Sequence, residues 1–394
     1  MAHSGVDSQR PAAVRPPAIS TECIEDPARF AGLRDEWNAL LAASPADCLF
    51  LTWEWLHTWW KHLANRRQLC LLLTRCGGEL AVIAPLVRRP RALRRLMPFR
   101  ALEFLGTGTV GSDYLDVIVR EGKDVEGLDA LADALAKTRL VLEFGQVRRE
   151  FSSVASLTAR LAARGWSDSE TPINPCPLVD LAGHSWESYL TSLGPEHRFQ
   201  RRLRNLEKRF DVRLDLVQTE AERREALDAL VAFHTSRWRE RGGSQAFGSP
   251  ELLSFHDEVS QLTLQRGWLR LFVLRLGGRP ATVFYGYRYG RAFYFYQSGF
   301  DPTFAKESVG LITIGLTIRR AIEEGAMEYD LLHGTEPYKF LWMPRVRELA
   351  RFELFPPGTG GAVCQRVAAA SGRIRRAVRR LVGDSVAERL VSQG

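Results

Sequence analysis

The sequence predicts an α/β fold with a mixed sheet, organised as two structurally related domains. Its 394 residues suffice for two domains with ordinary cores. Residues 69–82 and 269–282 align at an offset of 200, and each pattern is typical of a β-hairpin with a Gly-Gly turn. A Trp-containing helical segment precedes each hairpin, and further strands and helices follow. These observations favour an internal duplication; an accidental match between two common hairpins is the alternative.

In the N-terminal half, hydrophobic residues alternate between helical and extended spacing. We expect helices over residues 29–42 and 53–63, strands near 101–105, 115–119 and 141–146, and helices near 125–137 and 153–164. Pro172, Pro175 and Pro177 then indicate a junction between the halves.

The C-terminal half is predicted to place an antiparallel meander before a helical crossover. We expect helices over residues 186–193, 196–210, 221–240 and 252–268, strands over 213–217, 269–276, 281–289 and 291–297, then a helix over 308–325 and a strand over 327–332. The chain is therefore divided into a disordered leader (1–20), two domains (21–175 and 176–360) and a basic tail (361–394).

Composition and charge narrow the functional classes. Hydrophobic residues make up 45% and charged residues 25%, and no apolar run approaches the roughly 20 residues of a membrane span. Six scattered cysteines without a C-x-x-C pair favour a reducing cytoplasm over structural zinc. The net charge of +8 is concentrated in residues 198–213 and 362–394, at +5 each. Two basic patches on a near-neutral body argue against DNA binding.

The first candidate site is the strand, loop and helix between residues 293 and 325. A strand is followed by a loop that ends in Ser308-Val309-Gly310, and an apolar stripe at helical spacing runs to Gly325. Free N–H groups and the positive end of the helix dipole suit a phosphate or pyrophosphate at that point. An ordinary crossover helix with an empty N-terminus is the alternative.

The second candidate site is the turn that follows Asp330 at a predicted strand end, where α/β sheets gather binding residues. Tyr338 could donate a proton to a departing thiolate, and Glu336 or His333 could accept one from an amine. Lys339 adds a positive charge beside them. As the alternative, Tyr338 is a core aromatic and Lys339 a surface charge; Trp342 is assigned to the core.

Two further segments carry positive charge. The predicted helix over 196–210 has Arg198, Arg202 and Arg209 close to one face, where they could bind an anionic substrate or form a solvated surface. Arg237 and Trp238 are further candidates for holding an anionic acceptor. The tail has a basic amphipathic pattern that suits an anionic membrane surface, although packing onto the body is favoured.

Several common motifs are excluded. Residues 106–111 match G-x-G-x-x-G, but the next segment is predicted to be a strand, whereas a dinucleotide site requires a helix there. H-E-x-x-H, G-x-S-x-G and phosphate-binding P-loop patterns are absent from the sequence. The sequence thus gives no support for a metal site, a serine hydrolase or an NTPase.

The segments SVGLITIGLTIRRAIEEG (308–325), YDLLHGTEPYKFLW (329–342) and WEWLHTWW (53–60), with the Arg-rich helix, resemble the GNAT acyltransferases. The most similar branch is the CelD/BcsL group of cellulose and exopolysaccharide biosynthesis, which is similar in architecture to the tandem-GNAT Fem aminoacyltransferases. The resemblance covers roughly residues 20–355 and implies two tandem GNAT-like domains.

The resemblance also implies acetyl-CoA or another acyl-CoA as co-substrate. Its pantetheine would lie along the strand ending at Gln297, its pyrophosphate on the N–H groups of Ser308, Val309 and Gly310, and Tyr338 would protonate the thiolate. This chain departs from the family loop [QR]-x-x-G-x-[GA], because Ala305 and Ser308 stand at its first and middle positions. Lys306 could supply the missing side-chain contact. An aminoacyl-tRNA donor, as in the Fem group, needs no such loop.

The function expected from these features is acyl transfer to an amine or hydroxyl of a sugar or cell-envelope precursor, in the cytoplasm or at a membrane surface. Glu336 or His333 would act as base and Tyr338 as acid. The residues assigned to substrate are Arg198, Arg202, Arg237, Trp238, Asp330 and Lys339. The alternatives are a Fem-like transferase that uses aminoacyl-tRNA, and a non-catalytic scaffold that retains the fold.

Overall fold

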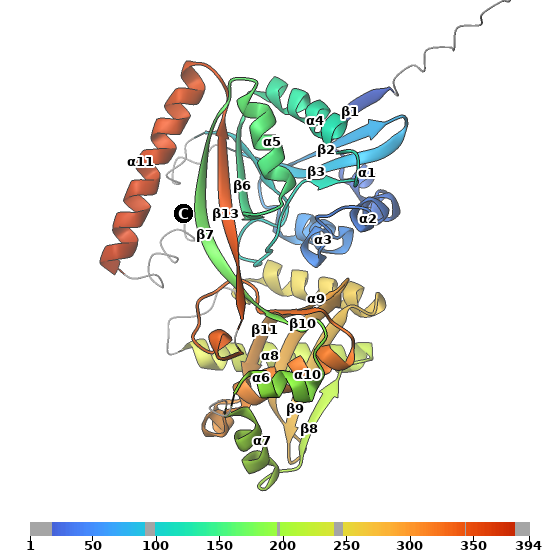
Figure 1. The fold of residues 1–394 in the computed structure, drawn as a ribbon, viewed down its shortest axis with the longest axis vertical. Helices are drawn as coiled ribbons and strands as arrows, with labels where there is room; N and C mark the ends of the chain where they lie inside the picture. Colours follow the sequence, from blue (N-terminus) through green and yellow to red (C-terminus); the bar gives the residue numbers. More distant parts are fainter. Residues whose placement is uncertain (1–17, 91–98, 195–197, 240–246, 343, 383–394) are drawn as a thin grey trace, which may run out of the picture.

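A mixed sheet of thirteen strands runs through both halves of the chain in the computed structural model (Figure 1). The structure describes residues 18–90, 99–194, 198–239, 247–342 and 344–382, without the side chains of 237–239 and 372–382. The strand order is β1-β2-β3-β4-β6-β13-β7-β12-β11-β10-β9-β8, and the short β5 (Ile118–Val119) pairs with β3. The predicted α/β fold with a mixed sheet is confirmed.

The two Gly-Gly hairpins predicted from the sequence have the same structure. They are β2 (Gln68–Cys76) with β3 (Glu79–Arg89), and β9 (Leu269–Leu276) with β10 (Arg279–Tyr289). All four turn glycines have positive φ, as a two-residue hairpin turn of this kind requires. In each turn an arginine, Arg75 or Arg275, donates a hydrogen bond of 3.4 Å to the carbonyl of the second glycine.

The order of strands repeats from each outer edge toward the centre. The edge strands are β1 (Ile19–Ile24) and β8 (Val212–Leu216). Further in, β4 (Ala101–Phe104) runs parallel to β6 (Val141–Arg148), as β11 (Ala292–Phe300) does to β12 (Glu328–Asp330). Helices α4 (Asp124–Thr138) and α10 (Val309–Glu323) make the corresponding crossovers. The halves are therefore tandem copies of one topology.

The two halves exchange their last strands at the centre of the sheet. Strand β13 (Arg345–Phe355) pairs with β6 of the N-terminal half, while β7 (Ser167–Asp180) pairs with β12 of the C-terminal half. β7 and β13 also pair with each other, and Figure 1 shows these long strands spanning both halves. The predicted boundary between residues 175 and 176 lies inside β7, and the domain ranges stay a prediction.

The three prolines of the predicted junction all lie within β7, so they do not interrupt this strand. Proline lacks an N–H donor and is tolerated only where the neighbouring chain needs no donor from it. Here Pro175 and Pro177 act as acceptors: their carbonyls receive the N–H groups of Gly334 and Leu331 over 3.1 and 2.9 Å. Along this edge of β7, the prolines contribute hydrogen-bond acceptors and no donors. The local sequence does not show that such a segment forms a strand.

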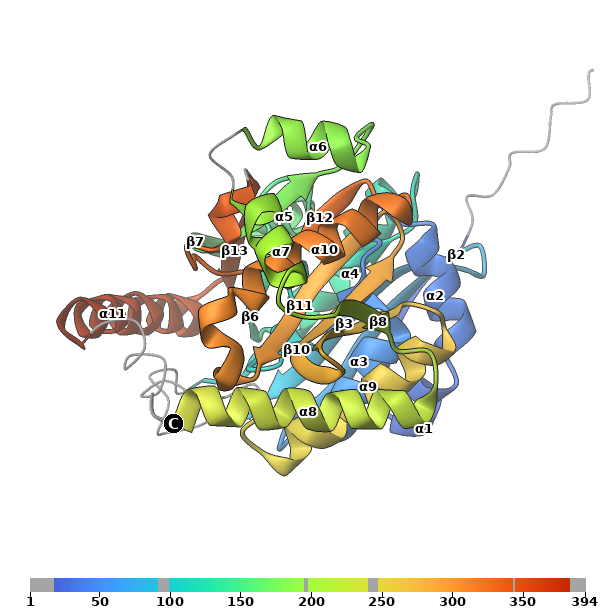
Figure 2. The ribbon, with the colours of Figure 1, turned by 90° about the horizontal axis from the view of Figure 1, so that it is seen from below.

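Helices cover both faces of the sheet, and Figure 2 shows α8 crossing one face of the C-terminal half while α7 and α10 lie on the other. Their bounds are α1 (Pro27–Ala31), α2 (Arg34–Ala42), α3 (Trp53–Leu63), α5 (Ser153–Ala162), α6 (Trp186–Ser192), α7 (Phe199–Glu207), α8 (Glu220–Arg239), α9 (Pro250–Gln265) and α11 (Thr359–Val382). Within the described residues, the 3₁₀ segments are η1 (Leu49–Leu51), η2 (Pro302–Glu307) and η3 (Lys339–Trp342).

Several element boundaries differ from those expected. The helix over 29–42 is two helices, because Gly32 and Leu33 separate α1 from α2. The strand over 115–119 shrinks to β5, and the strand expected to end at Gln297 continues to Phe300. β1 begins at Ile19, inside the predicted leader; residues 1–17 lie outside the description.

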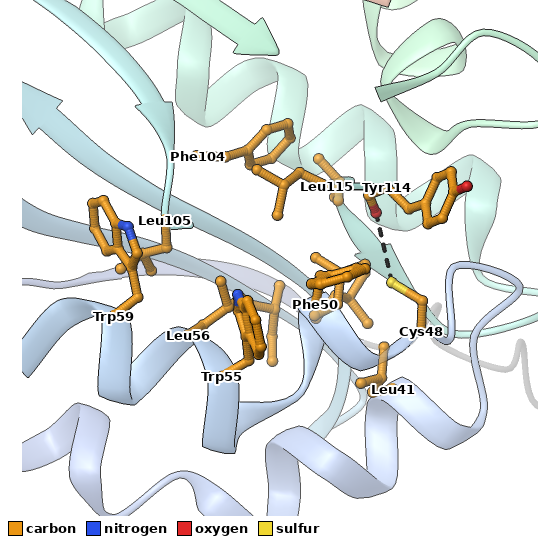
Figure 3. Close-up of a cluster of buried hydrophobic side chains, with 14 of the residues drawn as sticks. Leu41, Cys48, Phe50, Trp55, Leu56, Trp59, Phe104, Leu105, Tyr114 and Leu115 are labelled. Atoms are coloured by element: carbon orange, nitrogen blue, oxygen red, sulfur yellow. Dashed lines mark hydrogen bonds between the residues drawn. The ribbon is translucent and has the colours of Figure 1, made fainter. Parts of the chain in front are cut away.

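The Trp-rich segment of α3 forms part of the hydrophobic core (Figure 3). Trp55 and Trp59 are fully buried, and Phe50 meets the Trp55 ring edge-on at 4.9 Å between centroids. The Trp55 indole donates a hydrogen bond of 2.8 Å to Ser112 Oγ, which satisfies its buried N–H. This contact fixes the loop before β5 against α3.

In the described residues, no helix is long and apolar enough to cross a membrane. The predicted tail is helical as far as Val382 within α11, which flanks β7 and β13 in Figure 1. Its amphipathic pattern lies largely in side chains outside the description, so membrane contact stays a prediction.

Candidate active site

A cavity of about 510 Å³ opens at the N-terminus of α10. It lies between α10, α7, the end of β11 and the turn before β13. Its lining combines two arginines, the first turn of α10 and apolar side chains: Arg198, Arg202, Phe300, Ala305, Ser308, Val309, Gly310, Leu311, Tyr338 and Leu341. A polar rim with an apolar wall suits a ligand that has both anionic and apolar parts.

The backbone at Ser308 determines where α10 begins. Ser308 adopts the left-handed conformation (φ 57°, ψ 33°) between η2 and α10, and the first bond of the helix runs from the Ile312 N–H to the Ser308 carbonyl over 3.1 Å. Helix geometry therefore leaves the N–H groups of Val309, Gly310 and Leu311 without an intrahelical acceptor. A Cβ at Gly310 would meet no atom within 4 Å, so the backbone there faces open space.

Helix α7 lies close to α10 because Gly315 has no side chain. A Cβ at Gly315 would come within 2.2 Å of the buried Phe199 ring. This close approach allows Arg202 to donate a hydrogen bond of 2.5 Å to Ser308 Oγ. Just beyond the end of α7, Arg209 pairs with Glu307 over 2.6 Å. The guanidinium of Arg202 is thus held beside Ser308, next to the free N–H groups at the start of α10.

The structure brings six of the predicted site residues into one cavity. Val309 and Gly310 join Ser308 there, and Arg198 and Arg202 from the basic helix and Tyr338 from the later turn line the same space. The arginines, expected to hold an acceptor, thus face the segment expected to hold the donor. The side chains of Arg237 and Trp238 lie outside the description.

The remaining predicted residues do not line this cavity. Gln297 is half-buried within β11, beside a bulge where Tyr285 pairs with Gln297 and Gly286 with Phe295. Lys306 is exposed on η2. Their roles stay predictions.

Lys339 has a structural environment that the surface-charge alternative did not anticipate. It is only 4% exposed, and its Nζ donates hydrogen bonds to the carbonyls of His333 (2.7 Å) and Leu332 (3.4 Å). Glu336, 52% exposed, forms an ion pair with it over 3.1 Å. Lys339 therefore holds together the turn that carries Tyr338.

His333 connects this turn to the N-terminal half through Asp113. The backbone N–H of His333 donates to Asp113 Oδ2, and its Nδ1 lies 2.9 Å from both carboxylate oxygens. Asp113 is fully buried and also accepts a 2.8 Å hydrogen bond from Gln146. The Asp113 carboxylate raises the pKa of His333, because it stabilises the imidazolium. His333 is 40% exposed.

Asp330 forms a second connection between the halves. It is fully buried, accepts a 2.7 Å hydrogen bond from the Tyr114 hydroxyl and pairs with Arg347 over 3.2 Å. Its other oxygen accepts the Leu332 N–H over 2.8 Å. Burial raises the pKa of Asp330 to about 6. The predicted contact between Asp330 and a substrate is not supported by this burial.

Sequence reasoning missed Asp113 and Tyr114, which anchor the turn from the other half. They lie two and three residues after the rejected G-x-G-x-x-G segment, and the next element in the structure is a strand, not a helix. Tyr114 has a positive φ of 62°, and the guanidinium groups of Arg148 and Arg347 lie over its ring, 4.7 and 5.1 Å from the ring centroid. Partners so far apart in the chain leave no local signal.

Comparison with known proteins supports the family resemblance. Residues 197–340 match the family model described as an acetyltransferase (GNAT) domain, Acetyltransf_6. No match is found among the sequences of curated proteins.

Similar solved structures cover most of the chain at low identity. FemX has a TM-score of 0.60 at 13% identity, over 81% of this chain and 95% of FemX. A conserved protein of unknown function from Bacteroides thetaiotaomicron has 0.55 at 14% identity, over 85% and 100%. The C-terminal domain of a putative lysylphosphatidylglycerol synthetase from Agrobacterium fabrum has 0.51 at 11% identity, over 86% and 96%. At such identities the likeness shows the fold alone.

The cavity lies in the matched segment apart from Leu341, and the repeated strand order extends the relationship to both halves of the chain. Residues 197–340 of this chain thus match the model of a GNAT acetyltransferase domain, in a protein that has the tandem-GNAT fold.

Proposed function

We propose that this protein moves an acyl group, in the first instance acetyl, from acyl-CoA to an amine or hydroxyl of a sugar or cell-envelope precursor, as in exopolysaccharide synthesis. The observation that carries the proposal is the cavity at the N-terminus of α10, where free N–H groups, Arg202 and Tyr338 meet inside a GNAT domain. The CelD/BcsL resemblance supports the choice of a glycan precursor as acceptor.

In this proposal, the pyrophosphate of the donor binds the N–H groups of Val309, Gly310 and Leu311. A helix N-terminus supplies both oriented donors and a partial positive charge. Arg202 would add the side-chain contact that the family loop takes from its first Gln or Arg, because its guanidinium already lies at Ser308. Arg198 and Arg202 are therefore assigned to the donor phosphates, and the binding site of the acceptor is left to other residues.

The chemical step needs an oriented nucleophile, a base and an acid. The acceptor amine or hydroxyl attacks the thioester carbonyl and gives up its proton, and the thiolate that leaves receives one. Tyr338 is assigned as the acid, since its side chain is part of the cavity wall.

Two bases remain for the attacking group. Glu336 is exposed and negatively charged beside Lys339, which makes it available to a water or an amine. His333 uses Nδ1 for Asp113, and the Asp113 carboxylate raises the pKa of His333 by stabilising its protonated form, which disfavours the free base. We therefore assign Glu336 as the base, directly or through water, and His333 as its alternative.

The donor site is tested by calorimetry with acetyl-CoA on Gly310→Asp and Gly310→Asn. Both side chains enter the same open space, but only Asp places a charge beside the pyrophosphate. Two unit charges 4 Å apart near a protein surface repel by about 4 kcal/mol, so Asp should weaken binding more than tenfold relative to Asn. Equal affinities of the two variants would refute this donor site.

The acid is tested by thiol release from acetyl-CoA in the presence of amino-sugar acceptors. Tyr338→Phe should retain acetyl-CoA affinity and lose roughly 10²–10⁴-fold in turnover. Tyr189→Phe is the matched control, because the Tyr189 hydroxyl donates to the Trp342 carbonyl nearby without lining the cavity. Wild-type turnover in Tyr338→Phe would exclude this residue as the acid.

The role of Arg202 is tested with two donors. Arg202→Gln should weaken binding of acetyl-CoA at least tenfold but leave S-acetylpantetheine, which lacks the phosphates, unaffected. An equal effect on both donors would mean that Arg202 acts on the pantetheine, the acyl group or the fold. If Arg202→Gln changed the binding of neither donor, the arginines would instead be assigned to an anionic acceptor, as the sequence predicted.

An aminoacyl-tRNA donor is the second candidate, favoured by the altered phosphate loop and by the FemX-like fold. The discriminating measurement is transfer of a labelled aminoacyl group from tRNA to a cell-wall precursor, with acetyl-CoA as the competing donor. A protein that binds neither donor but associates with anionic vesicles in a salt-sensitive manner would instead be the non-catalytic scaffold.

A further inference from the structure

Two cysteine side chains are in contact where the edge strand β1 pairs with β2. The proposed function assigns no role to them. Cys23 lies on β1 and is exposed, whereas Cys70 lies on β2 and is 2% exposed. Their sulfur atoms are 3.4 Å apart. In the antiparallel register Cys23 stands opposite Leu72, so Cys70 is its diagonal neighbour on the same face.

The surroundings give the two sulfur atoms different chemistry. The hydrogen bond from Cys70 lowers the pKa of Cys23, and the positive charge of Arg88 acts in the same direction. The contact with Cys23, together with burial, raises the pKa of Cys70. Because the thiolate is the nucleophile in thiol–disulfide exchange, the exposed Cys23 is the attacking sulfur.

We propose that Cys23 and Cys70 are a dithiol modification site. A small disulfide oxidant such as glutathione disulfide converts the two thiols to a reversible disulfide between Cys23 and Cys70. The Cys23 thiolate attacks one sulfur of the oxidant, whose S–S bond breaks, and one glutathione thiolate leaves. Cys70 then loses its proton and attacks Cys23, which expels the second glutathione. One protein dithiol and one glutathione disulfide become one protein disulfide and two glutathione thiols.

The position of the pair predicts a bond that is readily reduced. Diagonal residues of an antiparallel pair have Cα atoms about 7–8 Å apart, whereas a relaxed disulfide requires about 4.4–6.8 Å. Oxidation must therefore draw β1 toward β2, and the strain favours reduction. β1 lies at the outer edge of the sheet with β2 as its neighbour, so the bond would fasten this edge strand covalently.

The test is thiol counting and peptide mapping after incubation of the whole protein with glutathione disulfide. The wild-type protein has six cysteines and should retain four thiols, with residues 23 and 70 joined and no bound glutathione. Reduced glutathione should restore all six. Hydrogen exchange of the backbone N–H groups in β1 should slow in the oxidised form.

Three variants define the order of the steps. Cys70→Ser should trap one glutathione on Cys23, and Cys23→Ser should retain all five of its thiols. Cys76→Ser, a buried cysteine on the same strand β2, is the matched control and should still lose two thiols. Six thiols in the treated wild-type protein, glutathione retained on Cys23, or a link to another cysteine would each overturn the proposal.

Discussion

Arg202 of α7 donates a hydrogen bond to Ser308, the N-cap residue of α10, and so joins the basic helix to the free N–H groups of the crossover helix. The distance between these residues depends on a contact two turns along α10, where Phe199 packs on the bare backbone of Gly315. The arginine and the helix terminus therefore form one anion-binding unit only while the two helices remain this close.

Gly315→Ala should destabilise the protein, although alanine is normally the better helix former. The added methyl would lie 2.2 Å from the Phe199 ring, and overpacking of this kind costs about 1–3 kcal/mol. Gly310→Ala is the matched control on the same helix: its methyl meets open space, so a gain of about 0.5–1 kcal/mol is expected. Urea unfolding measures both, and equal effects would show that Phe199 moves away without cost.

The acetyl-CoA affinity of Gly315→Ala should also fall, because α7 carries Arg202.

Tyr114→Phe should loosen the connection between the halves. The variant removes the hydroxyl that donates to the buried Asp330 carboxylate over 2.7 Å, and a hydrogen bond to a charged group contributes about 1.5–3 kcal/mol. Tyr289→Phe is the control, since it removes the same group from an exposed bond to Asp47 of equal length. Its cost should stay below about 1 kcal/mol. The free energy of unfolding in urea separates the two, and similar losses would contradict the role of burial.

Asp113→Asn should lower the pKa of His333. The Asp113 carboxylate raises this pKa in the folded protein, so its stabilising effect is present below pH 6.5 and is lost as the pH rises through the folded value. NMR titration of the histidine ring gives the pKa directly. Asp215→Asn, which removes an exposed carboxylate paired with Arg275, should leave His333 unchanged. An unaltered His333 pKa in Asp113→Asn would show that the pair is not electrostatically coupled.

Asp330 should make the protein less stable as the pH rises from about 4 to 6. Its folded pKa of about 6 lies above the ordinary value of 3.8, so the folded state binds the proton more tightly in this window. The protonated form therefore stabilises the fold, by an amount on the order of 2–3 kcal/mol. Asp330→Asn should flatten this part of the pH profile of unfolding, as measured by urea at fixed salt. If the stability of Asp330→Asn changed with pH as steeply as that of the wild type, the pH dependence would come from other groups. One such group is Asp116, whose pKa is also raised to about 6.

The paired hairpins and the crossover helix could be predicted because their signals are local. The Gly-Gly turns require positive φ, which glycine adopts without strain, and the stripe over 311–322 has the spacing of a helix that buries one face. The same stripe located the start of α10, and with it Ser308, Val309 and Gly310. The turn after the predicted strand end at Asp330 gave Tyr338 as a candidate, the family resemblance gave it the same role, and the structure places it at this cavity.

The exchange of β7 and β13 could not be predicted, because strand pairing over such distances depends on topology and not on local propensity. β13 finds its neighbours about two hundred residues back along the chain, at β6 and β7. The prolines of β7 predicted a break in the regular structure, because proline has no N–H donor. The sequence does not reveal that the neighbouring loop donates its own N–H groups to the carbonyls of Pro175 and Pro177.

The sequence by itself determined the repeated hairpins, the crossover helix and its phosphate-compatible terminus, because backbone conformation and periodic burial depend on neighbouring residues. Only the tertiary structure decided that Arg202 belongs to that terminus, that Lys339 is internal and that Asp113 and Tyr114 anchor the turn behind Tyr338. Those contacts join side chains far apart in the chain, and their energies arise from burial and charge pairing that exist only once the two halves have packed together.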